Sequence, residues 1–78
     1  MYLEIVTPDQ IIFQGEAHLV QLPGLDGSFE VLDHHTPMIA GLKKGQIRVL
    51  DTAKSESLYP INSGVIEVLN NKVMILAQ

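Results

Sequence analysis

Cysteine is absent from this 78-residue chain, which excludes a disulfide framework, a thiolate nucleophile and a cysteine-ligated metal site. Long apolar runs are absent too. Segments such as IIF and MILA fall far short of the roughly 18 residues that a membrane-spanning helix needs. No basic and apolar leader opens the sequence. We therefore expect neither a disulfide-stapled secreted domain nor an integral membrane protein.

Positive charge is absent from the first half of the chain. The formal net charge is −4, and the only cations are Lys43, Lys44, Arg48, Lys54 and Lys72. Binding of nucleic acid depends on clustered Lys and Arg side chains, so we expect no nucleic-acid partner. A basic protein surface would suit the acidic half better, although ordinary solvation of strands and turns accounts for these charges equally well.

Length and composition indicate one globular domain over residues 1–78. The chain is 46% hydrophobic and 18% charged, which is typical of a folded protein. A domain of this size buries only about 60 to 65% of the surface of its unfolded chain. We therefore do not expect a deep, enclosed active site.

Apolar and polar residues alternate with a period of two, which predicts strands. The alternating pairs are Leu3 and Ile5, Val20 and Leu22, Phe29 and Val31, Ile47 and Val49, Ile66 and Val68, and Val73 and Ile75. Turn-forming segments recur about every 8 to 12 residues, and no window carries a capped helical stripe. We predict an all-β domain, a small antiparallel β-sandwich or flattened barrel of about eight to ten short strands.

Three local patterns refine this prediction. Asn70-Asn71 should form a tight hairpin turn, because Asn tolerates positive φ. Pro60 lies inside the run SLYPI, so that strand should be an edge strand or carry a bulge. The segment VIEVLNNKVMIL is apolar on both faces. One face should pack in the core, and strand crossings or a second protein should cover the other.

Motifs for catalysis or metal binding are weak. His18, His34 and His35 would have to converge to hold zinc, yet adjacent histidines in an extended chain point to opposite faces. Ser28, Asp33 and His35 are close in sequence, but the G-x-S-x-G elbow of many serine hydrolases is missing. We interpret the histidines as surface or interface residues, and we predict no catalytic residue, no metal site and no cofactor.

Two further segments contain residues that bind phosphate or carry an acyl group in other proteins. PGLDGSF, residues 23–29, lacks the G-K-[ST] ending and the helix of a phosphate loop. We interpret it as a tight turn with Asp26 and Ser28 near its tip. Lys43 and Lys44 are candidates for acylation, although LKKGQ differs from the lysine settings of biotin and lipoate carriers. A free-standing carrier or small-ligand-binding module remains the competing interpretation.

Six segments occur in an order that is specific even though each is loose alone. They are LEIVTP, F-x-G-E, LPG-x-x-G-x-F-x-VL, H-x-P-x-I, LK-x-G-x-I-R-V and SG-x-x-EV…N-x-V-x-ILA. With this order over nearly its whole length, the chain resembles the N-terminal β-sandwich domain of the epsilon subunit of F-type ATP synthases. The resemblance implies a non-catalytic rotor subunit of the central stalk. Such a subunit bridges the gamma subunit and the c-ring and couples ion-driven rotation to ATP synthesis.

The resemblance also implies which residues meet each partner. For the c-ring these are Asp26, Gly27, Ser28, Phe29, Glu30, Asp33, His34, His35, Thr36 and Pro37. In family members the matching segments lie at one end of the sandwich, where the acidic residues would face basic loops. For the gamma subunit they are His35, Met38, Ile39, Ala40 and Leu42. Alternation sends Met38 and Ile39 to opposite faces, so one should be core and the other interface, in an order left open.

The resemblance further implies a peripheral membrane location on the cytoplasmic side of the bacterial inner membrane, with a plastid-encoded thylakoid chain as the alternative. It implies no direct lipid insertion. Longer members continue past the point matching ILAQ into an inhibitory C-terminal helical hairpin, so we expect this chain to lack that inhibition and to bind no ATP. Asp33-His34 stands where the family often has Pro-Gly, which predicts a partner-specific and pH-sensitive fit.

Overall fold

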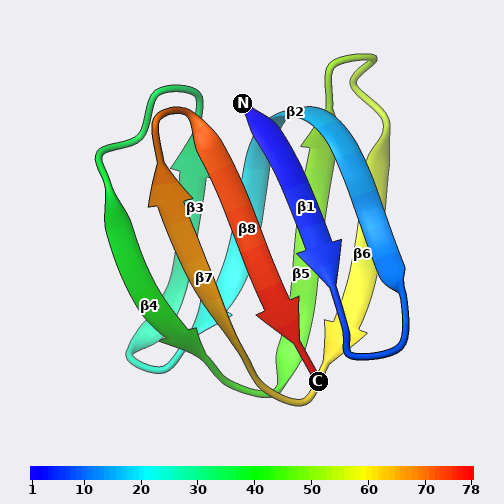
Figure 1. Ribbon diagram of the computed structural model, residues 1–78, viewed down its shortest axis with the longest axis vertical. Helices are drawn as coiled ribbons and strands as arrows, with labels where there is room; N and C mark the ends of the chain where they lie inside the picture. The colour runs from blue at the N-terminus through cyan, green and yellow to red at the C-terminus, as the bar shows by residue number, and fades with distance from the viewer.

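The computed structural model describes residues 1–78 and contains eight strands and no helix (Figure 1). The strands are β1 (Tyr2–Val6), β2 (Ile11–Gly24), β3 (Gly27–Leu32), β4 (Met38–Leu42), β5 (Gly45–Asp51), β6 (Glu56–Ile61), β7 (Gly64–Leu69) and β8 (Lys72–Ala77). The prediction of a small all-β sandwich is confirmed. No helix long and apolar enough to cross a membrane is found.

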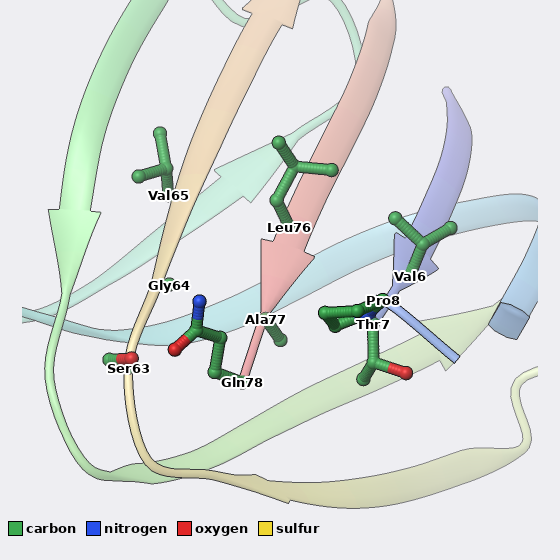
Figure 2. Close-up of a pocket in the computed structure, with 9 residues that line it drawn as sticks. All are labelled: Val6, Thr7, Pro8, Ser63, Gly64, Val65, Leu76, Ala77 and Gln78. Atoms are coloured by element: carbon green, nitrogen blue, oxygen red, sulfur yellow. The ribbon is translucent and has the colours of Figure 1, made fainter. Parts of the chain in front are cut away.

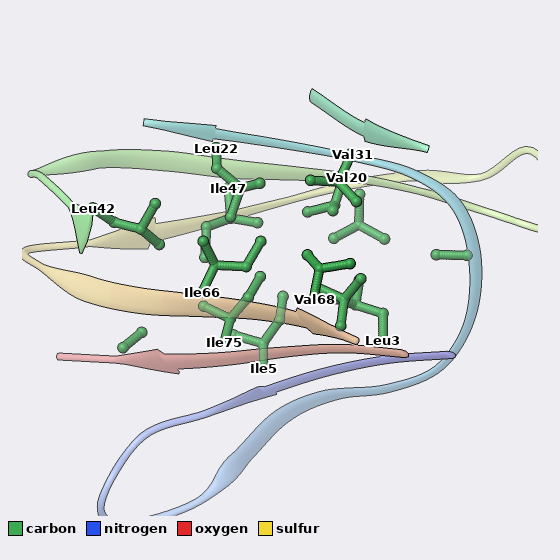
Figure 3. Packing of buried hydrophobic residues seen from close by; sticks show 14 of the residues in the cluster. Leu3, Ile5, Val20, Leu22, Val31, Leu42, Ile47, Ile66, Val68 and Ile75 are labelled. Carbon is green, nitrogen blue, oxygen red and sulfur yellow. The ribbon is translucent and has the colours of Figure 1, made fainter. Parts of the chain in front are cut away.

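The sheet folds over on itself into two layers, which Figure 3 shows on either side of the core. The first half of β2 lies with β1, β8, β7 and β4, and we call this set the first layer. The second half of β2 lies with β3, β5 and β6 in the second layer. With 14 residues, β2 is long enough to pass from one layer to the other. It therefore ties both layers into one sheet.

One strand pair departs from the predicted antiparallel arrangement. β1 and β8 run parallel, with Leu3 opposite Val73 and Ile5 opposite Ile75, whereas every other pair is antiparallel. Side-chain alternation has the same period in both kinds of ladder, so the sequence pattern could not reveal this. The first and last strands of the described chain thus lie side by side (Figure 1).

The two local predictions about turns and edges are confirmed. Asn70 and Asn71 have φ angles of 52° and 60° in the turn between β7 and β8, and two successive positive values are typical of a type I′ hairpin. Pro60 lies in β6, which ends the strand order of the sheet. Proline is tolerated there because an edge strand needs fewer backbone N–H donors.

The core consists of apolar side chains alone. Sixteen hydrophobic residues form one buried cluster, and no polar or charged residue is buried (Figure 3). It contains every residue of the alternating apolar pairs except Phe29, which is partly buried and packs against it. The alternating apolar residues therefore line the inner faces of the strands.

Candidate docking surfaces

The residues that the resemblance assigns to the c-ring lie in the β2–β3 turn, along β3 (Gly27–Leu32) and in the loop that follows it. The turn that contains Asp26 precedes β3, and the loop of residues 33–37 follows it, so the strand separates them (Figure 1). Six extended residues span roughly 20 Å. The expectation that both segments lie at one end of the sandwich is therefore wrong. The alternation at Phe29 and Val31 already carried this signal, since a strand there must hold its flanking turns apart.

The end formed by the β2–β3 turn joins the two layers. The backbone N–H of Leu25 donates to the carbonyl oxygen of Gly41 at 3.1 Å, and that of Lys43 donates to Pro23 at 2.8 Å. The turn is thereby bonded to β4 and to the β4–β5 connection. Asp26 lies at the exposed tip and forms no ion pair. This end offers a free carboxylate beside an exposed leucine side chain.

At the opposite end, the carboxylate of Asp33 is already occupied. One of its oxygens accepts a hydrogen bond from the α-ammonium group of Met1, and the other lies 3.1 Å from Nδ1 of His18. The hydrogen bond from the Met1 ammonium, followed by that from His18, holds the pKa of Asp33 below its ordinary value. Asp33 is therefore less available to a partner than the free carboxylate of Asp26.

The rest of this loop is held by backbone contacts. The N–H of His34 donates to Oδ1 of Asn71 at 2.8 Å, and the N–H of His35 donates to the carbonyl of Leu32 at 3.2 Å. Nδ1 of His35 lies 2.8 Å from the carbonyl oxygen of Thr36. His34 is exposed and His35 is half-buried. The loop thus has a fixed path, in which His34 is the more exposed of the two histidines.

The structure does not assemble the hydrolase triad or the metal site that the sequence analysis considered. Ser28 lies at the start of β3, whereas Asp33 and His35 follow its end, so the three residues of a hydrolase triad are not brought together. No group of three or more His, Cys, Asp or Glu side chains is placed to hold a metal ion.

The residues assigned to the gamma subunit divide between core and surface. Met38 and Ala40 pack against the buried cluster, and Leu42 belongs to it with 2% exposure. Ile39 points outward and is 72% exposed. The open question is thereby settled: Ile39 is the surface residue of the pair. Leu42 shares the inward face with Met38 and Ala40, so the expected direct contact at Leu42 is corrected to a core position.

Ile39 lies beside an apolar row that crosses the outer face of the first layer. The row follows the strand register from Val65 to Leu76, then to Val6 and Ile11. Below it is a hollow of about 510 Å³ to which Val65, Leu76 and Val6 contribute (Figure 2). A smaller hollow of about 160 Å³ lies between Ile39 and the row. The two-faced apolarity of VIEVLNNKVMIL was the sequence signal for this surface.

Acidic side chains lie next to the apolar row. Glu67 of β7 is opposite Ile39 in register, and Met74 connects it to Glu4 of β1. Glu4 accepts hydrogen bonds from Tyr2 and Gln14, whereas Glu67 is exposed and has no ion pair. A partner for this face would be largely apolar and would place a cation near Glu67.

Comparison with known proteins adds independent information. Residues 1–78 match the model of the protein family described as ATP synthase, delta/epsilon chain, β-sandwich domain. The ATP synthase epsilon chain of Chlorobium limicola is 42% identical over 76 residues, which cover 97% of this chain and 86% of that protein. The epsilon chain of Desulforapulum autotrophicum is 41% identical over 78 residues, and the match covers 100% of this chain and 58% of the relative.

Two solved assemblies contain chains of similar fold. One is the Euglena gracilis mitochondrial ATP synthase, OSCP/F1/c-ring, with a TM-score of 0.89, 22% identity and coverage of 96% of this chain and 48% of that chain. The other is the central stalk and c-ring of the Tetrahymena thermophila mitochondrial ATP synthase, with a TM-score of 0.86, 13% identity and coverage of 100% and 63%. At these identities the likeness concerns the fold alone.

Proposed function

Because this chain belongs to the family of ATP synthase delta/epsilon β-sandwich domains, we propose that it bridges the gamma subunit and the c-ring in the central stalk of an F-type ATP synthase. In this role it couples ion-driven rotation to ATP synthesis and is not itself an enzyme. It is peripheral to the membrane, on the cytoplasmic side of the bacterial inner membrane. The observation that carries the proposal is the exposed apolar surface around Ile39.

The gamma subunit binds this apolar surface. Ile39 is 72% exposed and lies between the β3–β4 loop and the apolar row. Burial of one isoleucine side chain contributes about 1.5 to 3 kcal/mol, so this residue alone accounts for a tenfold or larger part of the affinity. His35 lies three residues before β4. We therefore assign the β3–β4 loop to the gamma side and not to the c-ring.

The c-ring contacts the opposite end through the β2–β3 turn. Of the acids assigned to this contact, Asp26 lies at the tip of the turn, whereas Glu30 lies within β3 and Asp33 is occupied by Met1 and His18. An exposed ion pair contributes only about 0 to 1 kcal/mol. Asp26 therefore sets the register and rate of docking more than its strength.

Capture of the complex from native membranes in mild detergent tests both contacts. Ile39→Glu should lower recovery of the gamma subunit by about tenfold or more, because it removes apolar burial and places a charge in the interface. Its matched control is Leu58→Glu, which changes an exposed leucine of β6 in the other layer. Equal recovery of gamma with Ile39→Glu and the control would refute the assignment of this face.

The turn is tested by charge reversal. Asp26→Lys should reduce c-ring retention several-fold at low salt and less at high salt, since screening weakens exposed charge contacts. Glu30→Lys makes the same change in charge on β3 and should have little effect. If Glu30→Lys were the more damaging variant, the contact would run along β3 and not through the turn.

A further inference from the structure

The β2–β3 turn rests on a glycine of β4. A Cβ atom placed at Gly41 would lie 2.6 Å from Cδ1 and 3.3 Å from Cγ of Leu25. The Leu25 side chain therefore crosses the surface of β4 at a place that only glycine leaves free. The N–H of Leu25 also donates to the carbonyl oxygen of Gly41 at 3.1 Å. Backbone and side chain of one turn residue thus engage the same strand residue.

Gly45 makes a similar close contact with Pro23, on the other side of the β2–β3 turn from Leu25. A Cβ atom at Gly45 would lie 2.7 Å from Cβ of Pro23, and the carbonyl oxygen of Pro23 accepts the N–H of Lys43 at 2.8 Å. Pro23 and Leu25 are thereby held on either side of the β4–β5 connection. The directly registered pairing of β2 with β4 is a single residue pair, Gly24 with Leu42. The contacts of Pro23 and Leu25 therefore add to the single residue pair that joins β2 to β4.

Gly41, on which the Leu25 side chain lies, is close to Ile39 on the same strand. Gly41 is two residues after Ile39 on β4, and residues two apart on a strand share a face. The strand that carries the proposed gamma contact therefore also holds the turn that carries the proposed c-ring contact. Only one residue separates the exposed isoleucine from the seat of Leu25.

We propose that Leu25, seated on Gly41, is a positioning residue that fixes the β2–β3 turn relative to the gamma-binding part of β4. The inference rests on the proposed function, because it links the two contacts named there. A loose turn would still meet the c-ring but would yield under torque. The Leu25–Gly41 contact makes this corner of the subunit rigid, so that displacement of one contact carries the other with it.

Two variants weaken the seat from opposite sides. Leu25→Ala removes the side chain that lies over β4, and Gly41→Ala adds a methyl group that displaces it. In the isolated protein, both should raise the hydrogen-exchange rate of the residue-25 amide, relative to its rate in the unfolded chain, about five- to tenfold, because its hydrogen bond to Gly41 is weakened. Leu25→Met keeps a long apolar side chain and should retain slow exchange. Val49→Ala weakens the core elsewhere and controls for a general loss of stability.

In the assembled synthase, Leu25→Ala and Gly41→Ala should leave recovery of the gamma subunit unchanged and lower the ratio of ATP-driven ion pumping to ATP hydrolysis. Leu25→Met should restore that ratio. Faster amide exchange with an unchanged pumping ratio would overturn the positioning role while leaving the two docking contacts intact. Loss of c-ring retention with Leu25→Ala alone, without effect of Gly41→Ala, would show instead that Leu25 touches the c-ring directly. Failure of the unmodified chain to capture gamma and the c-ring would refute the proposed function itself.

Discussion

Asp33 illustrates what a residue's identity leaves undetermined. In the sequence it is one of several acids in a cation-free half, and the resemblance assigns it to a basic partner. In the fold it is bound by the Met1 ammonium group and by His18, which are 32 and 15 residues away along the chain. Alternation predicts which face a side chain occupies, but it carries no information on such distant pairs. The free and the occupied carboxylates could therefore be told apart only in the fold.

The occupied carboxylate predicts a specific dependence of stability on pH. Because the pKa of Asp33 is lowered in the folded state, its contribution is present above the ordinary value of 3.8 and is lost as pH falls through the lowered pKa. Asp33→Asn should be less stable than the parent at neutral pH, and the difference should shrink below about pH 4. Urea unfolding across a pH series measures this.

Asp26→Asn is the matched control, since Asp26 forms no ion pair. Its stability should differ little from the parent at any pH. Identical pH profiles for the Asp33 and Asp26 variants would contradict the role assigned to the Met1 and His18 contacts.

At the scale of elements, the hairpin between β7 and β8 was predictable in type but not in its contacts. The pair Asn70-Asn71 suffices to predict a turn with positive φ, and the structure has it. The hydrogen bond from the His34 N–H to the Asn71 side chain was not predictable. It joins two connections that are remote in sequence and meet only because β3, β4 and β7 pack as they do. The β7–β8 turn thereby holds the backbone of the β3–β4 loop in place.

Replacing each asparagine separates these two tasks. Asn71→Gly keeps the backbone freedom that the turn requires but removes Oδ1, so the His34 amide should exchange faster while the β7–β8 amides stay protected. Asn70→Ala forces alanine into a left-handed conformation and should cost about 1 to 2 kcal/mol of global stability. Hydrogen exchange by NMR and denaturant unfolding distinguish them. A slow His34 amide in Asn71→Gly would argue against the support.

At the scale of the whole molecule, fold class and inner faces were predictable because both follow from period-two patterning and turn chemistry. The parallel closure of β1 on β8 and the separation of the β2–β3 turn from the β3–β4 loop were not predicted. Closure of the sheet depends on which strands pair with each other, and the alternation of apolar and polar residues carries no information on strand pairing. The exposed side of β4 was narrowed to Met38 or Ile39 by alternation, and burial in the fold then selected Ile39.

The sharing of β2 between the layers predicts that both unfold together. Tyr2 lies in β1 of the first layer and Tyr59 in β6 of the second, and the chain contains no tryptophan. In Tyr59→Phe the fluorescence reports on Tyr2 in the first layer. In Tyr2→Phe it reports on Tyr59 of β6, whose ring meets Phe13 of β2 edge to face at a centroid distance of 6.2 Å. Each variant should show a fluorescence midpoint in urea equal to its own circular-dichroism midpoint, as in two-state unfolding. Separate midpoints would mean that the layers melt independently.

The side-by-side placement of β1 and β8 also bears on how the protein is made. Ribosomes add about 5 to 20 residues per second from the N-terminus, so β1 and β2 leave the ribosome seconds before β8. Until β8 follows, β1 keeps one edge without hydrogen-bond partners, and exposed edges invite pairing with other chains. The nascent sandwich therefore closes only after β8 is released, and until then the free edge of β1 is open to pairing with other chains.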